Sequence, residues 1–465
     1  MNQGKHRISW KNLWADHNTK IVFSVLLLLF MAQSLFFAFR LKTGIIPDEP
    51  AHFTFSQHFS TTLGIPPDTY KTYSWGWYIE QNPFLYYWIN GRIINLVTFL
   101  QPAATDSQLL TLLRVTNVFY ALGTLLFCYM LSREVIKHRW WSLVPVFLIT
   151  QTLMFVFLSA GVNYDNLANL LSMAGLYFLI RVFNHHNFLN NSLSWMISIA
   201  LGTLVKYPIL PLALAMGIAW LVFTVTQRDK IFPLKFSGSK TTIAMFVLIL
   251  LLIGNLSIYG VNLVRYQSLT PDCNEILLES QCEISPYFRR AQETANKPRL
   301  TISESLAEGF PNPIRYSAVD WVWNMLMRTY GIIGHQTYFP LRLISFYHLL
   351  FYWVFILSWI NLLHWRRLSY INLSMLGIII FYALVLLITN YQSELTYNFQ
   401  QIALQGRYIF PVIGPIYILL TTVIRRTPIK LLRWGTLVFL LGLTSLGGSL
   451  TLLVGINTFL QSWFN

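Results

Sequence analysis

Apolar runs, separated by polar stretches, recur along the whole of this chain. A helix needs about 20 predominantly apolar residues to cross the hydrocarbon core of a bilayer, so each run predicts a membrane-spanning helix. The pattern predicts about eleven of them, at 21–39, 112–132, 140–160, 166–183, 193–205, 208–226, 242–264, 341–363, 371–390, 408–424 and 434–456. The predicted fold class is therefore an all-α polytopic membrane protein.

Two polar connections between the runs are long, at 43–111 and 265–340, whereas the others are short. The first run is preceded by a basic segment and is not followed by a small-residue cleavage site, which favours a retained signal anchor over a removed signal peptide. We therefore expect a cytoplasmic N-terminal segment, 1–20, and one transmembrane domain, 21–465.

Each long connection carries a recognisable local pattern. The apolar stretch that begins at Asn82-Pro83-Phe84 is interrupted by asparagine and arginine, which favours an amphipathic helix lying in the membrane interface. The second connection contains Cys273 and Cys282. In an oxidising external loop, two cysteines without further thiol ligands favour a disulfide over a metal site.

The charge distribution orients the chain. It carries 33 Lys and Arg against 18 Asp and Glu, a formal net charge of +15. With the N-terminus inside, this excess falls in the inner connections, as the positive-inside rule requires, and both long loops face outward. Clusters such as Arg425-Arg426 are then topological anchors. Nothing resembles a basic stripe on a soluble face, so no nucleic-acid partner is expected.

The motifs of soluble enzymes are missing from the sequence. It contains no phosphate-binding Gly-rich loop, no dinucleotide fingerprint, no nucleophile elbow and no His-Glu-x-x-His. The residues that could carry chemistry stand instead at the outer ends of predicted spans.

Asp48 and Glu49 follow the first span closely, where charges are costly, about 2.5–3.5 kcal/mol each at the centre of a membrane helix and less towards the interface. One interpretation is a helix start, because an acidic first turn interacts well with the helix dipole. The interpretation that we favour is a general base in a partly desolvated site. His52 shares a helical face with Glu49; it could bind a metal together with Glu49, relay protons or form a local hydrogen bond.

Three further polar residues stand at outer span ends. Asp165 is either the N-cap of span 166–183 or a second carboxylate in the same cavity as Asp48. Lys206 either extends its charged end to water or binds an anionic headgroup. Arg407 enters the tenth span from outside, and its guanidinium fork favours a phosphate partner, although Glu394 or Asp48 could serve instead.

Several of these motifs together resemble the GT-C superfamily, which contains the lipid-carrier-dependent glycosyltransferases of bacterial and endoplasmic membranes. They are Pro47-Asp48-Glu49-Pro50-Ala51-His52-Phe53, Asn82-Pro83-Phe84-Leu85-Tyr86-Tyr87 and Asn163-Tyr164-Asp165. More narrowly, the chain from about residue 20 to 425 is similar to the bacterial membrane family called domain of unknown function 2142. That similarity adds Lys206-Tyr207-Pro208, Tyr330-Gly331-Ile332-Ile333-Gly334 and Gln405-Gly406-Arg407-Tyr408-Ile409-Phe410-Pro411.

The resemblance implies a GT-C-like helical bundle in the bacterial cytoplasmic (inner) membrane, with its active site facing the outside or periplasm. It implies an inverting transfer of a hexosyl or pentosyl group from a polyprenyl-phosphate donor to a glycan, lipid or protein acceptor in cell-envelope polysaccharide biosynthesis. Asp48 would be the catalytic base, with Glu49 as its neighbour. The substrate and donor phosphate would be bound by Arg407, Lys206, Asp165, His52 and Tyr408.

Two departures from the family pattern matter. Asn82-Pro83-Phe84 stands where many relatives have His-Pro-Pro, so a role for that histidine does not transfer. No Asp-x-Asp pattern occurs at the acidic site; a divalent metal is possible but no cofactor is required by the sequence. The alternative functions are a transporter or flippase of lipid-linked saccharides, or a non-catalytic envelope-assembly protein.

Overall fold

The computed structural model describes residues 10–75, 78–231, 238–285, 288–289, 292–293, 300–309, 312–333, 337–338, 340–364, 369–396, 404–454 and 461–464. Within these ranges the regular structure is helical, apart from two short antiparallel strands, β1 (Ile332–Ile333) and β2 (Thr337–Tyr338). The predicted all-α fold class is therefore confirmed. Residues 1–9 of the predicted cytoplasmic segment lie outside the described residues.

The helices vary from single turns to spans of 31 residues. Those of the first half are α1 (Trp10–Arg40), α2 (Glu49–Phe59), α3 (Tyr70–Ser74), α4 (Leu85–Leu100), α5 (Asp106–Ile136), α6 (Val144–Thr150), α7 (Leu153–Ser159), α8 (Tyr164–Phe183), α9 (Phe188–Val205), α10 (Leu210–Thr226) and α11 (Arg228–Ile231). Those of the second half are α12 (Ser239–Asn255), α13 (Val261–Tyr266), α14 (Cys273–Ile276), α15 (Glu279–Cys282), α17 (Ile302–Glu308), α18 (Pro313–Arg315), α19 (Trp321–Tyr330), α20 (Leu341–His364), α21 (Tyr370–Thr396), α22 (Ile413–Arg426), α23 (Lys430–Leu446) and α24 (Ser449–Val454). Short 3₁₀ or π segments join some of them: η1 (Trp141–Leu143), η2 (Tyr207–Ile209), η3 (Leu256–Gly260), η4 (Tyr316–Asp320) and η5 (Gly406–Val412).

Nine helical segments in the described part of the chain are long and apolar enough to cross a membrane, and a tenth arises if α6 and α7, bent by 65°, form one span. The predicted count of about eleven differs at the C-terminal end. Residues 434–456 contain two helices, α23 and α24, separated by Gly447-Gly448. Two consecutive glycines interrupt a helix because each has a low helix propensity.

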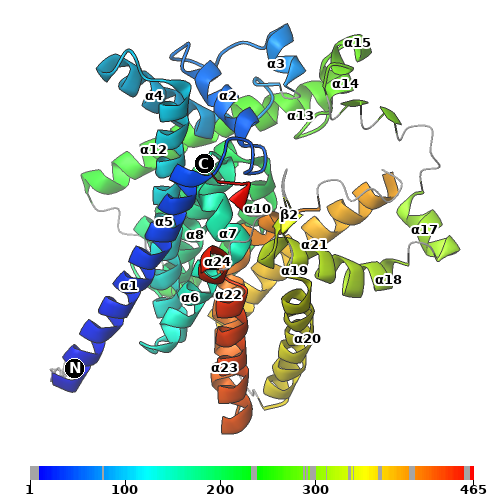
Figure 1. Cartoon of the computed structure of the whole chain (residues 1–465). Coiled ribbons are helices and arrows are strands. Elements are labelled where there is room, and N and C mark those ends of the chain that lie inside the picture. Colours follow the sequence, from blue (N-terminus) through cyan, green and yellow to red (C-terminus); the bar gives the residue numbers. More distant parts are fainter. Residues whose placement is uncertain are drawn as a thin grey trace.

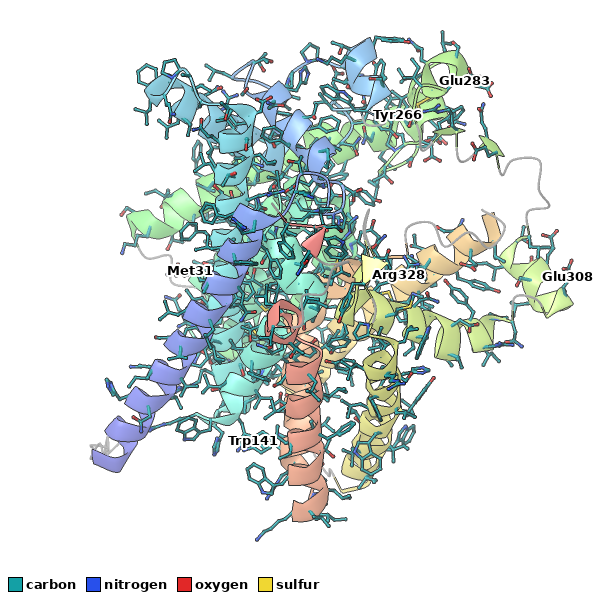
Figure 2. All side chains as sticks on the ribbon, in the orientation of Figure 1. Met31, Trp141, Tyr266, Glu283, Glu308 and Arg328 are labelled. Atoms are coloured by element: carbon teal, nitrogen blue, oxygen red, sulfur yellow. A yellow bond between two sulfur atoms is a disulfide. The ribbon has the colours of Figure 1, made fainter. Side chains whose placement is uncertain are left out.

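The first long loop and the first part of the second lie at the same end of the molecule, whereas α17, α18 and α19 of the second loop lie at mid-height in Figure 1. In Figure 1, α2, α3 and α4 of the first loop and α14 and α15 of the second lie together at the top. Figure 2 places Tyr266 and Glu283 at this end and Trp141 at the opposite end. The side of the membrane that these loops face stays a prediction.

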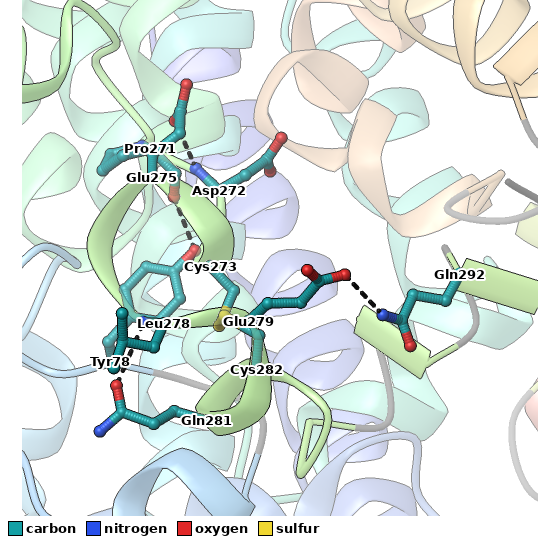
Figure 3. The surroundings of a disulfide bond; sticks show 10 residues. All are labelled: Tyr78, Pro271, Asp272, Cys273, Glu275, Leu278, Glu279, Gln281, Cys282 and Gln292. Atoms are coloured by element: carbon teal, nitrogen blue, oxygen red, sulfur yellow. Dashed lines mark hydrogen bonds between the residues drawn. A yellow bond between two sulfur atoms is a disulfide. The ribbon is translucent and has the colours of Figure 1, made fainter.

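A disulfide closes a small loop in the second connection. Cys273 and Cys282 are bonded, with their Cα atoms 5.8 Å apart, and the Cys282 side chain is buried. Close by, the Tyr78 hydroxyl donates a hydrogen bond of 2.6 Å to the carbonyl of Pro271 (Figure 3). Burial, together with nearby carboxylates, raises the pKa of the Tyr78 hydroxyl, which therefore stays protonated as this donor. The disulfide loop is thus attached to the first long loop.

Close packing fixes α2 relative to the spans. The α8 helix packs against both α5 and α9, and α4 packs against α2 at Gly91. A Cβ at Gly91 would lie only 2.8 Å from the Phe59 carbonyl carbon, so glycine is required for this approach. α2 carries Glu49 and His52 and follows Asp48 directly, and its fixed position determines the geometry described below.

Candidate active site

The helix that follows the first span begins directly after Asp48. Asp48 is the N-cap residue of α2 and has a left-handed φ of 60°, which Asp tolerates better than most residues do. Pro50 fits the first turn because its missing N–H has no helical partner there. The Asp48 side chain makes no capping hydrogen bond. Helix capping therefore does not explain this carboxylate.

The Asp48 carboxylate reaches Arg407 instead. Its Oδ2 accepts a hydrogen bond of 2.5 Å from Nη2 of Arg407. Nε of Arg407 lies 3.6 Å from Oδ2 of Asp165, and Nζ of Lys206 donates a hydrogen bond to Oδ1 of Asp165. The four charged residues that the sequence places at separate span ends thus form one group, the charged cluster of Asp48, Asp165, Lys206 and Arg407.

Asp48 is the accessible member of the charged cluster. Its side chain is 39% exposed, whereas those of Arg407, Lys206 and Asp165 are 4–7% exposed. The formal charges of the four residues cancel, which lets them be buried together because each has an opposite neighbour. Asp48 is therefore the member best placed to exchange a proton with water.

Lys206 is bound on several sides by protein. Besides its hydrogen bond to Asp165, its Nζ lies 4.5 Å from the ring centre of Tyr164 and 4.6 Å from that of Tyr408. Such cation–π contacts stabilise an ammonium from which water is excluded. Lys206 is therefore the counter-ion of Asp165 in this structure, and its predicted binding of a donor phosphate stays a prediction.

Arg407, in contrast, has N–H groups that find no hydrogen-bond acceptor among the described residues. Among the described residues, its Nε and Nη1 have no hydrogen-bond partner, and neither does Oδ2 of Asp165, since 3.6 Å is too long for a hydrogen bond. Unsatisfied donors of a buried guanidinium are costly. A site with unpaired guanidinium N–H groups beside an unpaired carboxylate oxygen is suited to an anion that carries a hydroxyl-bearing group.

Asp165 is not the N-cap of α8, which was one of its two predicted roles. α8 begins at Tyr164, and the cap is Asn163, whose side chain accepts a hydrogen bond of 2.9 Å from the backbone N–H of Asp165. Because Asn163 caps the helix, the Asp165 carboxylate is available for the charged cluster.

Glu49 pairs with a residue that the sequence analysis missed. Nε and Nη2 of Arg114 donate hydrogen bonds of 2.7 and 2.6 Å to the two carboxylate oxygens of Glu49, which is fully buried. Nη1 of Arg114 also binds the carbonyls of Ala38 and Leu41, at 3.1 and 2.7 Å. Arg114 thereby ties the end of α1 to the start of α2. A lone arginine near the start of the predicted span 112–132 was the available signal, since such charges in membrane helices are rare and usually paired.

His52 lies beside the cluster as a neutral side chain. Its Nδ1 is 2.8 Å from the Tyr87 hydroxyl, and its ring packs edge-on against Tyr164, with 4.5 Å between ring centres. Burial lowers the pKa of His52 to about 4, against the opposing effect of Asp48. The described residues contain no group of three His, Cys, Asp or Glu side chains that could hold a metal. In the alternative pair of Glu49 and His52, both carboxylate oxygens of Glu49 accept hydrogen bonds from Arg114, and a metal role of the pair stays a prediction.

A glycine beside Arg407 yields a testable prediction. A Cβ at Gly406 would lie 2.4 Å from the carbonyl carbon of Arg328, so η5 can touch α19 only through glycine. Gly406→Ala should lower stability by about 1–3 kcal/mol, typical of overpacking, and reduce activity by displacing Arg407. Thermal unfolding and turnover measure the two effects. Gly435→Ala is the control, because a Cβ there meets nothing within 4 Å; equal behaviour of the two variants would contradict the prediction.

Comparison with known proteins gives distant structural similarity only. No protein-family model matches the chain, and no curated protein matches it. Among solved structures, it is similar to ArnT from Cupriavidus metallidurans bound to undecaprenyl phosphate (12% identity, TM-score 0.45, covering 94% of this chain and 66% of that one). A second similar structure is the Archaeoglobus fulgidus oligosaccharyltransferase tethered with an acceptor peptide (13% identity, TM-score 0.47, covering 94% of this chain and 56% of that one). The chain is also similar to the arabinosyltransferase EmbB from Mycobacterium smegmatis (12% identity, TM-score 0.43, covering 86% of this chain and 30% of that one).

The chain thus spans between 30% and 66% of the length of these three proteins. Similarity at this level describes a resemblance of shape and carries no argument about activity. Membership of the family called domain of unknown function 2142 stays a prediction, since no family model matches.

Proposed function

We propose that this chain is an integral membrane glycosyltransferase that moves a hexosyl or pentosyl group from a polyprenyl-phosphate donor to an envelope acceptor on the outer face. The observation that carries the proposal is the buried Arg407, two of whose nitrogens have no hydrogen-bond partner among the described residues, beside the accessible carboxylate of Asp48. Asp48 lies in a short motif that resembles the GT-C superfamily, and Arg407 lies in one that resembles the narrower family called domain of unknown function 2142. The active site would face the outside or periplasm of a bacterial inner membrane.

The proposed reaction requires a base for the acceptor hydroxyl and a cation for the donor phosphate. Asp48 takes the proton of the acceptor hydroxyl, whose oxygen attacks the anomeric carbon as the bond to phosphate breaks, with inversion. Arg407 stabilises the charge that develops on the phosphate. Phosphate is a good leaving group, so no strong general acid is needed. Glu49 holds the loop that carries Asp48 through Arg114, and we assign it a positioning role.

An apolar cavity supports a lipid-linked donor. It has a volume of about 370 Å³ and lies among α19, α20, α21, α22 and α23, with Leu326, Leu350, Leu376 and Leu420 in its lining. α22 continues directly from η5, the segment that carries Arg407. A carrier whose phosphate binds Arg407 could extend its hydrocarbon chain along α22 towards this cavity.

Donor binding through Arg407 is tested with Arg407→Lys. Lysine keeps the charge but lacks the planar fork, so the KM for a polyprenyl-phosphate sugar should rise about tenfold, the loss expected for one charge-assisted hydrogen bond. The measurement is transfer of labelled sugar by the purified full chain in lipid nanodiscs. Arg315→Lys, at an exposed arginine (78% of the side chain), is the control. An unchanged KM for Arg407→Lys would contradict the proposal.

One observation favours transport as a second candidate. The span α6–α7 is bent by 65°, and discontinuous spans are frequent in transporters. Sealed vesicles separate the two functions: a transporter moves labelled lipid-linked sugar across the membrane without an acceptor. A glycosyltransferase instead releases polyprenyl phosphate, in proportion to added acceptor.

A further inference from the structure

Asp48 accepts a hydrogen bond from the Arg407 nitrogen that a bidentately bound phosphate would also use. A guanidinium can bind an oxyanion bidentately through Nη1 and Nη2, or through Nε and Nη2. Both forks include Nη2, which donates to Asp48 at 2.5 Å. A phosphate that binds either fork therefore comes next to the Asp48 carboxylate.

The charges of the cluster oppose this approach. Asp48 and Asp165 balance Arg407 and Lys206, so the charged cluster is neutral before a ligand enters. The phosphodiester of a polyprenyl-phosphate sugar adds one negative charge. Two negative charges beside one donor repel each other. Of the two carboxylates, Asp48 is the one with room to move away, because it is 39% exposed whereas Asp165 is 4% exposed and bonded to Lys206.

We propose that Asp48 and the donor phosphate compete for Arg407, so that donor binding releases the catalytic base. The inference rests on the proposed function and adds an order of events to it. Without donor, Asp48 is held by Arg407 and is a weak base, since a neighbouring cation favours the ionised form. With donor bound, the carboxylate loses this partner and becomes a better proton acceptor.

The same competition assists release of the product. In the transfer step, the acceptor O–H bond breaks and its proton moves to Asp48. The acceptor oxygen bonds to the anomeric carbon, and the electron pair of the broken carbon–oxygen bond stays with polyprenyl phosphate. Asp48, which water can reach, then loses the proton, and the restored carboxylate competes with the product phosphate for Nη2 of Arg407.

The test is the affinity of the full chain, in nanodiscs of neutral phospholipid, for polyprenyl phosphate and for the matching polyprenol without phosphate. Asp48→Asn and Asp48→Gly both tolerate a positive φ. Each should bind polyprenyl phosphate about tenfold more tightly than the natural chain, since a charged competitor is removed. Affinity for polyprenol should be the same in all. Asp320→Asn removes an exposed carboxylate elsewhere, 47% exposed and paired with Arg315 at 3.9 Å, and should leave both affinities unchanged.

The outcomes distinguish a failure of the proposed competition from a failure of the proposed glycosyltransferase function. Tighter phosphate binding by both Asp48 variants supports competition. Equal or weaker binding by both, with measurable binding by the natural chain, overturns competition and leaves the glycosyltransferase proposal standing. Absence of phosphate-dependent binding in every variant overturns both. An equal gain in affinity for polyprenyl phosphate in Asp320→Asn would show a general effect of removing a negative charge and would also overturn competition.

Discussion

Sugar transfer by an Asp48→Asn variant should fall about 10²–10⁴-fold, the range that a positioned general base contributes. The amide has no basic oxygen to take the acceptor proton, although it can still accept a hydrogen bond from Arg407. Folding should be little affected. Asn tolerates the left-handed φ of 60° at this N-cap, and the Asp48 side chain makes no capping hydrogen bond that would be lost.

The measurement is the single-turnover rate of sugar transfer at saturating donor, which removes any effect of tighter donor binding. Thermal unfolding and membrane insertion of the variant are compared with those of the natural chain. Asp320→Asn is the matched control, because it removes an exposed carboxylate outside the charged cluster. A rate within a few-fold of the natural one, in a folded protein, would exclude Asp48 as the base and leave Asp165 to be examined.

The membership of the charged cluster was predictable from the sequence because a membrane aligns the ends of its helices. Asp48, Asp165, Lys206 and Arg407 each stand at an outer end of a predicted span, so they share one level in the protein. Asp48 was only one of three candidate partners of Arg407, beside a phosphate and Glu394, and the sequence could not choose among them. Asp48 meets Arg407 across 359 positions, and that contact depends on the packing order of the helices, which the apolar pattern does not specify.

The irregular spans show a second feature that the hydropathy pattern does not predict, the breaks within a span. A hydropathy pattern averages over a run of residues, so it predicted continuous helices at 140–160 and 434–456. The structure bends the first between α6 and α7, where Oγ1 of Thr152 hydrogen-bonds to the Tyr417 hydroxyl at 2.7 Å. It interrupts the second at Gly447-Gly448. Such breaks depend on individual polar contacts and glycines. Because these residues change the mean hydropathy of a run only slightly, the pattern does not reveal them.

The buried pair of Glu49 and Arg114 should have the largest effect on stability. Arg114→Leu leaves the fully buried Glu49 carboxylate without its partner, and Glu49→Gln leaves a guanidinium that is 4% exposed. Breaking such a pair from one side costs about 3–5 kcal/mol, because a buried charge remains uncompensated. Arg114→Leu also removes hydrogen bonds to the carbonyls of Ala38 and Leu41, so it should be the more destabilising of the two.

The double variant Glu49→Gln/Arg114→Leu shows whether the two side chains stabilise the fold as a pair or independently. It buries no unpaired charge, so its loss of stability should be well below the sum of the single losses, giving a coupling of about 0.5–3 kcal/mol. Thermal unfolding of the four proteins in one detergent measures this cycle. The exposed pair Arg315 and Asp320, 3.9 Å apart with side chains 78% and 47% exposed, is the control cycle and should couple by less than about 1 kcal/mol. Additive losses at Glu49 and Arg114 would mean that the two side chains stabilise the fold independently, and Glu49 would then lose its assignment as the residue that positions Asp48.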